Sequence, residues 1–163
     1  MSEQKIEYFI NKILIGDAQK NALEFVAYLK VNEMLFERGG GYWEDKFYWY
    51  VKYANETVCF VLIGSEEKPK EKSDSWSIWS DDSDSNGFGD FPLDEQTKEI
   101  AWKHVDFCGH CGSCSGGTSK MIFGREFNNV CRTTMRFNTP DVETVEGMKK
   151  IFEIRKNDIL KNV

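Results

Sequence analysis

The amino-acid sequence predicts an α+β fold, in which two N-terminal helices and a long C-terminal helix pack on a small antiparallel sheet beside a cysteine-rich loop. Apolar residues recur with a helical period near both ends of the chain, and with the two-residue period of a strand after residue 47. The length of 163 residues and the 40% hydrophobic content suit one packed core. Residues 1–163 are therefore expected to form a single domain.

Two amphipathic helices are expected in residues 6–32. Gly16 is expected to end the first, because glycine adopts the left-handed conformation of a C-cap at little cost. Asp17 is expected to cap the second helix, and Asn32 to end it. The apolar positions that form the buried faces are Ile6, Phe9, Ile10, Ile13 and Leu14 in the first helix and Ala22, Phe25, Val26 and Leu29 in the second. Such stripes are typical of core packing.

Strands are expected in the middle of the chain. Residues 47–53 alternate as a strand with one buried face, and residues 57–63 form the nearly continuous apolar run of a central strand. Residues 76–79 suggest a third strand, with Trp76 and Ile78 on the same side. Cys59, in the second strand, is expected to be a buried and inert thiol.

The first of these strands carries Tyr48 and Tyr50 on its second face, which is more aromatic than one-sided burial requires. Small-molecule sites are lined by aromatic side chains with a few polar groups. Tyr48, Tyr50 and Trp76 are therefore a candidate ligand pocket. The interpretation in which helices cover this face is favoured, because such pockets are few in any one protein.

An acidic segment follows the third strand. Asp82, Asp84, Asn86 and Gly87 match the first half of a calcium-binding loop, which places oxygen ligands at alternate positions and a glycine at the sharp turn. Leu93 stands where that loop needs a bidentate glutamate, and no helix is expected before it. The favoured interpretation is an acidic surface turn, with calcium as the alternative.

The C-terminal half is expected to begin with a helix that Asp94 caps and that runs to about His104 or Asp106. Residues 120–123 suggest a strand, residues 125–131 a helical turn and residues 135–137 a final strand. Residues 139–141, Thr-Pro-Asp, predict the start of the long C-terminal helix. Its solvated outer face is expected to carry Lys149, Lys150, Arg155 and Lys156.

The most informative segment is the cysteine cluster in residues 104–131. Cys108, Cys111 and Cys114 are spaced C-x2-C-x2-C, and Cys131 follows from a different element. Two residues between cysteines let both sulfur atoms reach one ion, and a glycine after Cys111 permits the turn of a metal knuckle. These four cysteines are the predicted metal ligands, with His104 and His110 in reserve.

Three interpretations of the cluster compete. A structural zinc ion is favoured, because it is the commonest partner of four cysteines, or of three cysteines and a histidine. An iron–sulfur cluster is the first alternative, since three closely spaced cysteines with a remote fourth also ligate such clusters. The third interpretation is free thiols, or a redox pair, with no metal.

Composition excludes several classes of function. A net charge of −6 argues against nucleic acid and anionic membranes, and no apolar run approaches the roughly 20 residues that span a bilayer. Because no signal peptide is recognisable, a cytoplasmic location is expected, where cysteines stay reduced. No catalytic motif is present, so a non-enzymatic binding or regulatory domain with a small-molecule ligand is favoured. A redox protein and a metal-assisted hydrolase are the alternatives.

Several segments around the cluster share a further pattern. Residues 122–127 read I-F-G-R-E-F, and Val-Cys follows at 130–131, Met-Arg-Phe at 135–137 and Pro-Asp at 140–141. With the cysteine spacing and the segments 58–60 and 75–78, the chain resembles an uncharacterised family of small proteins from Gram-positive bacteria. The resemblance covers most of the chain and implies a free-standing domain. It implies no activity and no catalytic residue.

Overall fold

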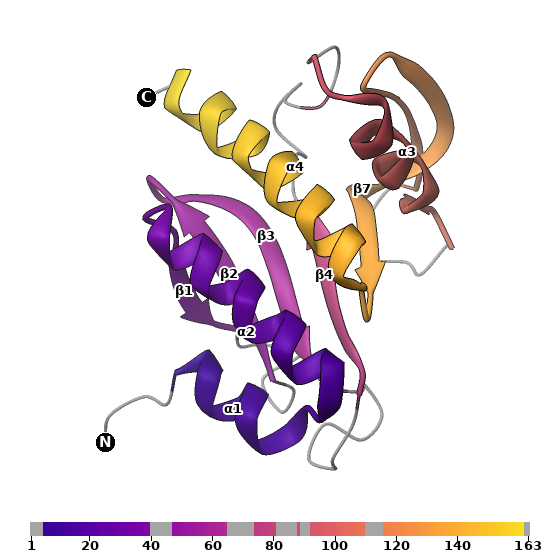
Figure 1. Cartoon of the computed structure of the whole chain (residues 1–163). Helices are drawn as coiled ribbons and strands as arrows, with labels where there is room; N and C mark the ends of the chain where they lie inside the picture. The colour runs from indigo at the N-terminus through magenta and orange to yellow at the C-terminus, as the bar shows by residue number, and fades with distance from the viewer. Residues whose placement is uncertain are drawn as a thin grey trace.

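The computed structural model describes residues 5–39, 47–64, 74–80, 88, 92–109 and 116–161 (Figure 1). These residues form four helices and a seven-stranded antiparallel sheet, which confirms the α+β prediction. The elements are α1 (Ile6–Ile13), α2 (Gly16–Val31), β1 (Leu35–Arg38), β2 (Tyr48–Tyr53), β3 (Glu56–Ile63), β4 (Trp76–Ser80), α3 (Glu95–Lys103), β5 (Val105–Phe107), β6 (Thr118–Ile122), β7 (Arg125–Asn138) and α4 (Val142–Lys161). The strand order is β1-β2-β3-β4-β7-β5, and β6 pairs with β7.

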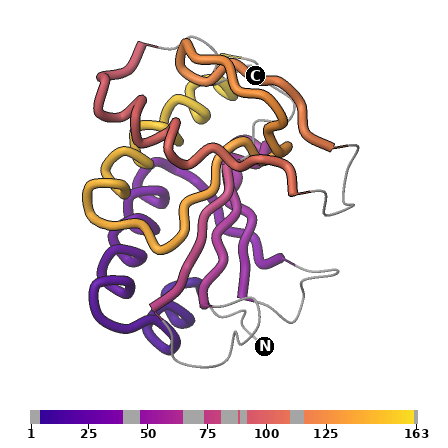
Figure 2. Tube along the Cα trace, turned by 90° about the vertical axis from the view of Figure 1, so that its right-hand side faces the viewer, coloured from indigo at the N-terminus to yellow at the C-terminus, as the bar shows by residue number. Residues whose placement is uncertain are grey.

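Helices α1, α2 and α4 lie on one face of the sheet formed by β1 to β4 (Figure 2). The core between these two layers is aromatic. The Phe25 ring of α2 lies 6.1 Å from the Trp76 ring of β4 and 5.9 Å from the Phe152 ring of α4, and Phe152 lies 6.3 Å from Phe137 of β7. Trp76 and Ile78 share the helix-covered face, as the sequence predicts.

The turn between the first two helices differs from the expectation. Gly16 does adopt a left-handed conformation (φ 59°), but it is the first residue of α2 and does not end α1. The C-cap of α1 is Leu14, and the N-cap of α2 is Ile15, which has no capping side chain. Asp17 lies in the first turn of α2, where its charge still complements the positive end of the helix. Asn32 is the C-cap of α2, as predicted.

The 14-residue strand β7 confirms the strand predicted at residues 135–137, but the helical turn predicted at residues 125–131 is wrong, because those residues form the N-terminal part of the same strand. Thr118 pairs with Val130 and Lys120 with Phe127, so β7 has one residue more than β6 between these pairs. Asn129, at φ 59°, lies at this bulge. The bulge places Phe127 and Val130 on one face although they are three residues apart, which is the spacing of a helix.

Both C-terminal helices are capped by aspartate. The Thr97 backbone N–H donates to Asp94 Oδ1 at 2.9 Å, as predicted, and α3 ends at Lys103 because the chain then pairs with β7. The Thr144 N–H donates to Asp141 Oδ1 at 2.8 Å, so α4 begins two residues later than expected. The Thr139 N–H instead donates to the Trp76 carbonyl at 2.7 Å and extends the sheet.

Arg155 does not lie on the outer face of α4, contrary to the prediction. Its side chain is buried, and its Nη2 donates to the Thr57 carbonyl of β3 at 3.2 Å. Its Nη1 lies 3.4 Å from Asp158 Oδ2, one helical turn away. Arg155 therefore fastens α4 to the sheet through a charged hydrogen bond.

The substitution Phe152→Ala tests the core between the helices and the sheet. We expect the free energy of unfolding to fall by about 3–5 kcal/mol, because a fully buried phenylalanine is replaced by a cavity. Urea denaturation followed by circular dichroism measures the change. Val142→Ala, at a 56% exposed apolar position of the same helix, is the control and should cost less than about 0.5 kcal/mol. A loss below about 1 kcal/mol for Phe152→Ala would contradict this packing.

The helix caps predict a loss of stability in acid. The Thr97 N–H, and then the Lys150 ammonium group, lower the pKa of Asp94 to about 2. The Thr144 N–H likewise lowers the pKa of Asp141. Because the folded chain prefers the ionised form, this stability is complete above the unfolded pKa of about 3.9 and is lost as pH falls from about 5 towards 2.

The measurement is the urea midpoint as a function of pH for the wild type and Asp94→Asn. We expect the variant to be less stable than the wild type at pH 7 and to lose less on acidification. Glu99→Gln, at an exposed position of the same helix, should follow the wild type. Parallel wild-type and Asp94→Asn curves would show that the cap carries no pH-dependent stability.

Candidate functional site

The pairing of β5 with β7 brings two of the four predicted cysteine ligands together. The Cys108 N–H donates to the Asn129 carbonyl at 2.8 Å, and the preceding pair is Phe107 with Val130. Cys131, two residues beyond Asn129, is thus the diagonal neighbour of Cys108. Diagonal neighbours are about 7–8 Å apart between backbones. Two cysteine side chains can close that gap to the roughly 3.8 Å between sulfur atoms that zinc–sulfur bonds of about 2.3 Å require.

The other two cysteines, and His110, lie outside the described residues, in the segment 110–115. The residues on both sides of that segment contact the same point of β7. Cys108 pairs with Asn129 on one side, and Thr118 pairs with Val130 on the other. Gly117 packs so closely on Asn129 that a β-carbon there would lie 2.4 Å from Asn129 Oδ1. Cys108 and Gly117, on the two sides of the segment, therefore both lie beside Asn129.

Asp106 adds a carboxylate that the sequence interpretation missed. Thr133 Oγ1 lies 3.1 Å from Asp106 Oδ2 and 3.4 Å from Cys131 Sγ, so all three side chains share one face of β5 and β7. Alternation along β5 places Cys108 on the face of Asp106. Asp106 went unnoticed because it was expected at the end of a helix. Its carboxylate oxygens are acceptable zinc ligands.

His104, one of the reserve ligands, is engaged elsewhere. Its Nδ1 lies 2.7 Å from the Ile100 carbonyl, which only accepts hydrogen bonds, so Nδ1 carries the proton. Its ring packs 4.8 Å from Phe137. Because α3 ends at Lys103, His104 and Cys108 do not lie on one helix. Within the described residues, no three histidine, cysteine or acidic side chains are placed to hold a metal, so the predicted site depends on residues 110–115.

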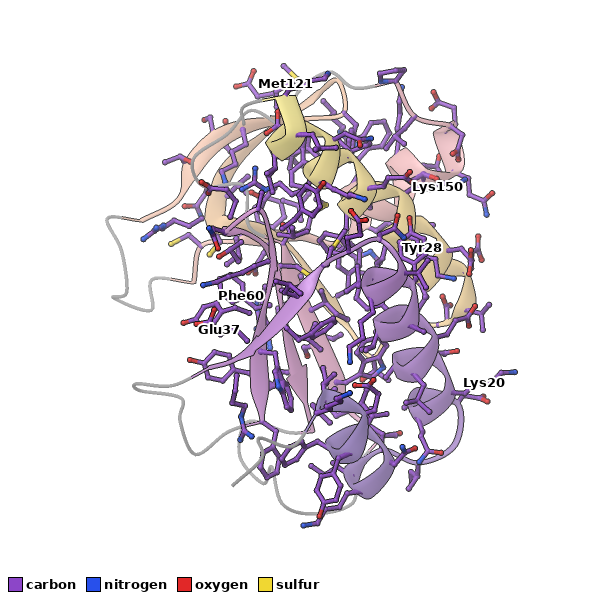
Figure 3. All side chains as sticks on the ribbon, turned by 90° about the vertical axis from the view of Figure 1, so that its left-hand side faces the viewer. Lys20, Tyr28, Glu37, Phe60, Met121 and Lys150 are labelled. Carbon is purple, nitrogen blue, oxygen red and sulfur yellow. The ribbon has the colours of Figure 1, made fainter. Side chains whose placement is uncertain are left out.

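The predicted pocket of Tyr48, Tyr50 and Trp76 is not formed. Phe60 lies on the face of the sheet turned away from the helices (Figure 3). The Tyr50 ring lies 5.1 Å from the Phe60 ring and 5.7 Å from the Tyr48 ring. Trp76 is fully buried on the opposite face beneath Phe25. The strand alternation separates them, because Trp76 pairs with Ile63 in the helix-facing row. The helices therefore do not cover the tyrosines, contrary to the favoured interpretation.

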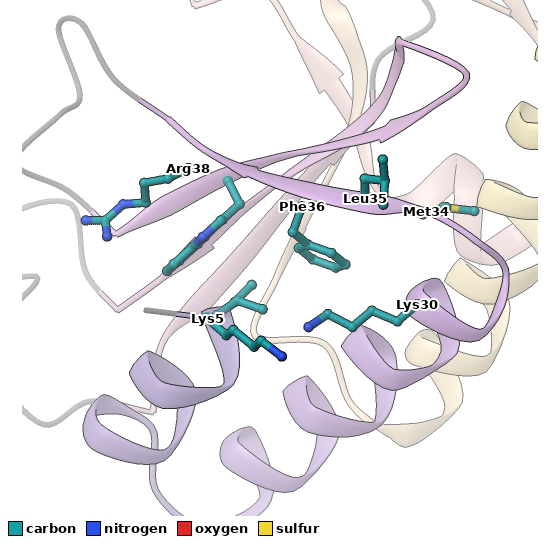
Figure 4. Close-up of a pocket in the computed structure, with 8 residues that line it drawn as sticks. Lys5, Lys30, Met34, Leu35, Phe36 and Arg38 are labelled. Carbon is teal, nitrogen blue, oxygen red and sulfur yellow. The ribbon is translucent and has the colours of Figure 1, made fainter. Parts of the chain in front are cut away.

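The structure forms a different pocket, between the start of α1, the end of α2 and β1 (Figure 4). Lys5, Lys30 and Arg38 contribute its cationic groups, and Phe36 and Trp49 are part of its apolar lining. No local pattern in the sequence indicates this pocket, since these residues converge only when β1 pairs with β2.

The calcium alternative, Asp82, Asp84 and Asn86, falls outside the described residues and stays a prediction. In the described part of the chain, no helix is both long and apolar enough to cross a membrane. Comparison with known proteins finds no family model, no curated protein and no solved structure that matches the chain.

The burial of the cysteines predicts their order of reaction. In protein stripped of metal by a chelator, we expect iodoacetamide to modify Cys108 and Cys131 at least about tenfold faster than Cys59. Cys59 is fully buried in β3 and reacts only when the core opens, whereas the other two are partly exposed. Peptide mapping by mass spectrometry measures the rates. Similar rates for the three thiols in folded protein would contradict the placement of β3 in the core.

Proposed function

We propose that this chain is a non-enzymatic binding or regulatory domain in which a structural zinc ion holds the cysteine-rich loop to the sheet. Cys108, Cys111, Cys114 and Cys131 are its ligands. A closed site of four thiolates leaves no open coordination position, so the ion would stabilise the fold without catalysing a reaction. A cytoplasmic location belongs to the proposal, because thiolate ligands must remain reduced.

The observation that supports the proposal is the diagonal placement of Cys108 and Cys131 on paired strands. Twenty-two residues separate these cysteines in the sequence, yet each is next to the Phe107–Val130 pair that joins β5 to β7. The hydroxyl of Thr133, between Cys131 and Asp106, can orient a ligand through a second interaction, as is usual around bound metals. An iron–sulfur cluster would use the same four cysteines and is the second candidate.

Elemental analysis of protein purified without a metal-binding tag tests the proposal. We expect about one zinc per chain and no visible absorption. Zinc at about 1,000 times its Kd stabilises a fold by about 4 kcal/mol, so its removal should lower the Tm by about 8–16 °C for a chain of this size. Iron with visible absorption would refute the zinc site and support an iron–sulfur cluster.

The matched variants are Cys131→Ser and Cys59→Ala. We expect the first to lose zinc and the stabilisation that zinc provides, because it removes a predicted ligand. The second should keep one zinc per chain, since Cys59 lies in β3, within the helix-covered sheet. Full zinc content in Cys131→Ser, or no metal in the wild type, would refute the proposed site.

A further inference from the structure

The pocket at the β1 edge of the sheet has a volume of about 260 Å³. Ile6 of α1, Phe36 of β1 and Trp49 of β2 provide apolar walls, with Met34 at the turn that enters β1. Ile6, Met34 and Trp49 are almost fully buried, so these walls are continuous with the core. The volume lies just below the range of about 300–1,000 Å³ that is usual for small-molecule sites. The pocket therefore suits a small ligand with an apolar body.

Cationic groups from three elements border these walls: Lys5 beside α1, Lys30 of α2 and Arg38 of β1. In Figure 4 the ammonium groups of Lys5 and Lys30 point towards one another below Phe36. The Arg38 guanidinium stacks on Phe9 and Trp49, 4.9 and 5.1 Å from their ring centres. Lys5 and Lys30 thus bring two positive charges together in a chain of net charge −6, and like charges that converge on one opening attract an anion.

Glu7 holds one of these cations in place. Lys30 Nζ lies 2.8 Å from each Glu7 carboxylate oxygen. Burial acts to raise the pKa of Glu7, but the hydrogen bond from Lys30, a backbone hydrogen bond and the charges of Lys30 and Lys5 outweigh it and lower this pKa. Lys30 therefore stays paired. An ammonium group has three donors, so one hydrogen of Lys30 remains for a ligand.

We propose that this pocket binds a small organic carboxylate with an aromatic or short aliphatic body. The body would contact Phe36, Met34 and Trp49, and the carboxylate would accept hydrogen bonds from Lys5 and Lys30. An organic cation would be repelled by the same lysines. A neutral analogue would bring no negative charge, and Glu7 would be the counter-charge to both ammonium groups.

This ligand class rests on the binding function proposed above, but not on the proposed zinc site. The pocket lies at the β1 edge, and Cys108 follows β5, which is at the other end of the strand order. Metal content and ligand binding are therefore separate measurements. Zinc without carboxylate binding would refute the pocket alone, and carboxylate binding without metal would refute the cysteine site alone.

The experiment is a titration of the full chain with 3-phenylpropionate, its neutral amide 3-phenylpropanamide and the cation 3-phenylpropylamine, followed by amide chemical shifts in NMR. We expect saturable shifts at residues 5–7, 30 and 34–38 with the carboxylate, and at least about tenfold weaker binding of the amide and the amine. Absence of saturable shifts, equal affinity for the amide, or shifts confined to other regions would overturn the proposal.

Matched variants test which lysine side chains bind the carboxylate. Lys30→Gln and Lys5→Gln should each weaken binding of the carboxylate about tenfold, because each removes a charged hydrogen bond. Lys20→Gln, on the exposed outer side of α2 (Figure 3), changes the net charge by the same amount as the other two variants. It should bind the carboxylate with an affinity within about twofold of the wild type. Equal weakening in all three variants would reduce the effect to net charge and refute a specific site.

Discussion

Strand β7 is the constraint on which both the core and the cysteine region depend. Its C-terminal part pairs with β4, where Trp79 lies opposite Arg136, and places Phe137 in the core. Its N-terminal part pairs with β5 and β6, which carry the two sides of the cysteine-rich segment. One 14-residue strand thus joins the helix-covered sheet to the candidate metal site. A shorter strand could not serve both.

This double role requires an irregular strand, and the buried Ser80 hydroxyl stabilises β7 at the irregular position, Thr134. Thr134 has φ 64°, which is unfavourable for a β-branched residue, and it is fully buried. At this position the Ser80 hydroxyl donates to the Thr133 carbonyl and accepts from the Met135 N–H at 3.0 Å. Ser80 therefore satisfies backbone groups that a regular ladder would have paired, which is the condition for burying them.

The sequence predicted those elements whose signal is local. The apolar stripes of α1, α2 and α4, the alternation of β2 and the cap at Asp94 all depend on neighbouring residues. β1 was missed, because Leu-Phe-Glu-Arg is a short edge strand with two charged residues. Only the C-terminal part of β7 was predicted, because the bulge gives its N-terminal part a helical period. Partnerships across the sheet, including Thr133 with Asp106 and the separation of Trp76 from Tyr48, follow from register, which no local pattern fixes.

The difference in burial between the two parts of the molecule would give the proposed metal ion a physical role. The sheet from β2 to β4 is ordered by a large apolar core, whereas the residues next to the cysteine segment are largely exposed: Phe107 is 53% exposed and Met121 48%. Ordering one residue costs about 1–2 kcal/mol of backbone entropy. Apolar burial offsets that cost in the core. The flanks of this segment have little apolar surface to bury, because they consist of Gly109, Gly116, Gly117 and the polar start of β6. An ion bound by Cys108 and Cys131 would supply there the stabilisation that the core supplies elsewhere.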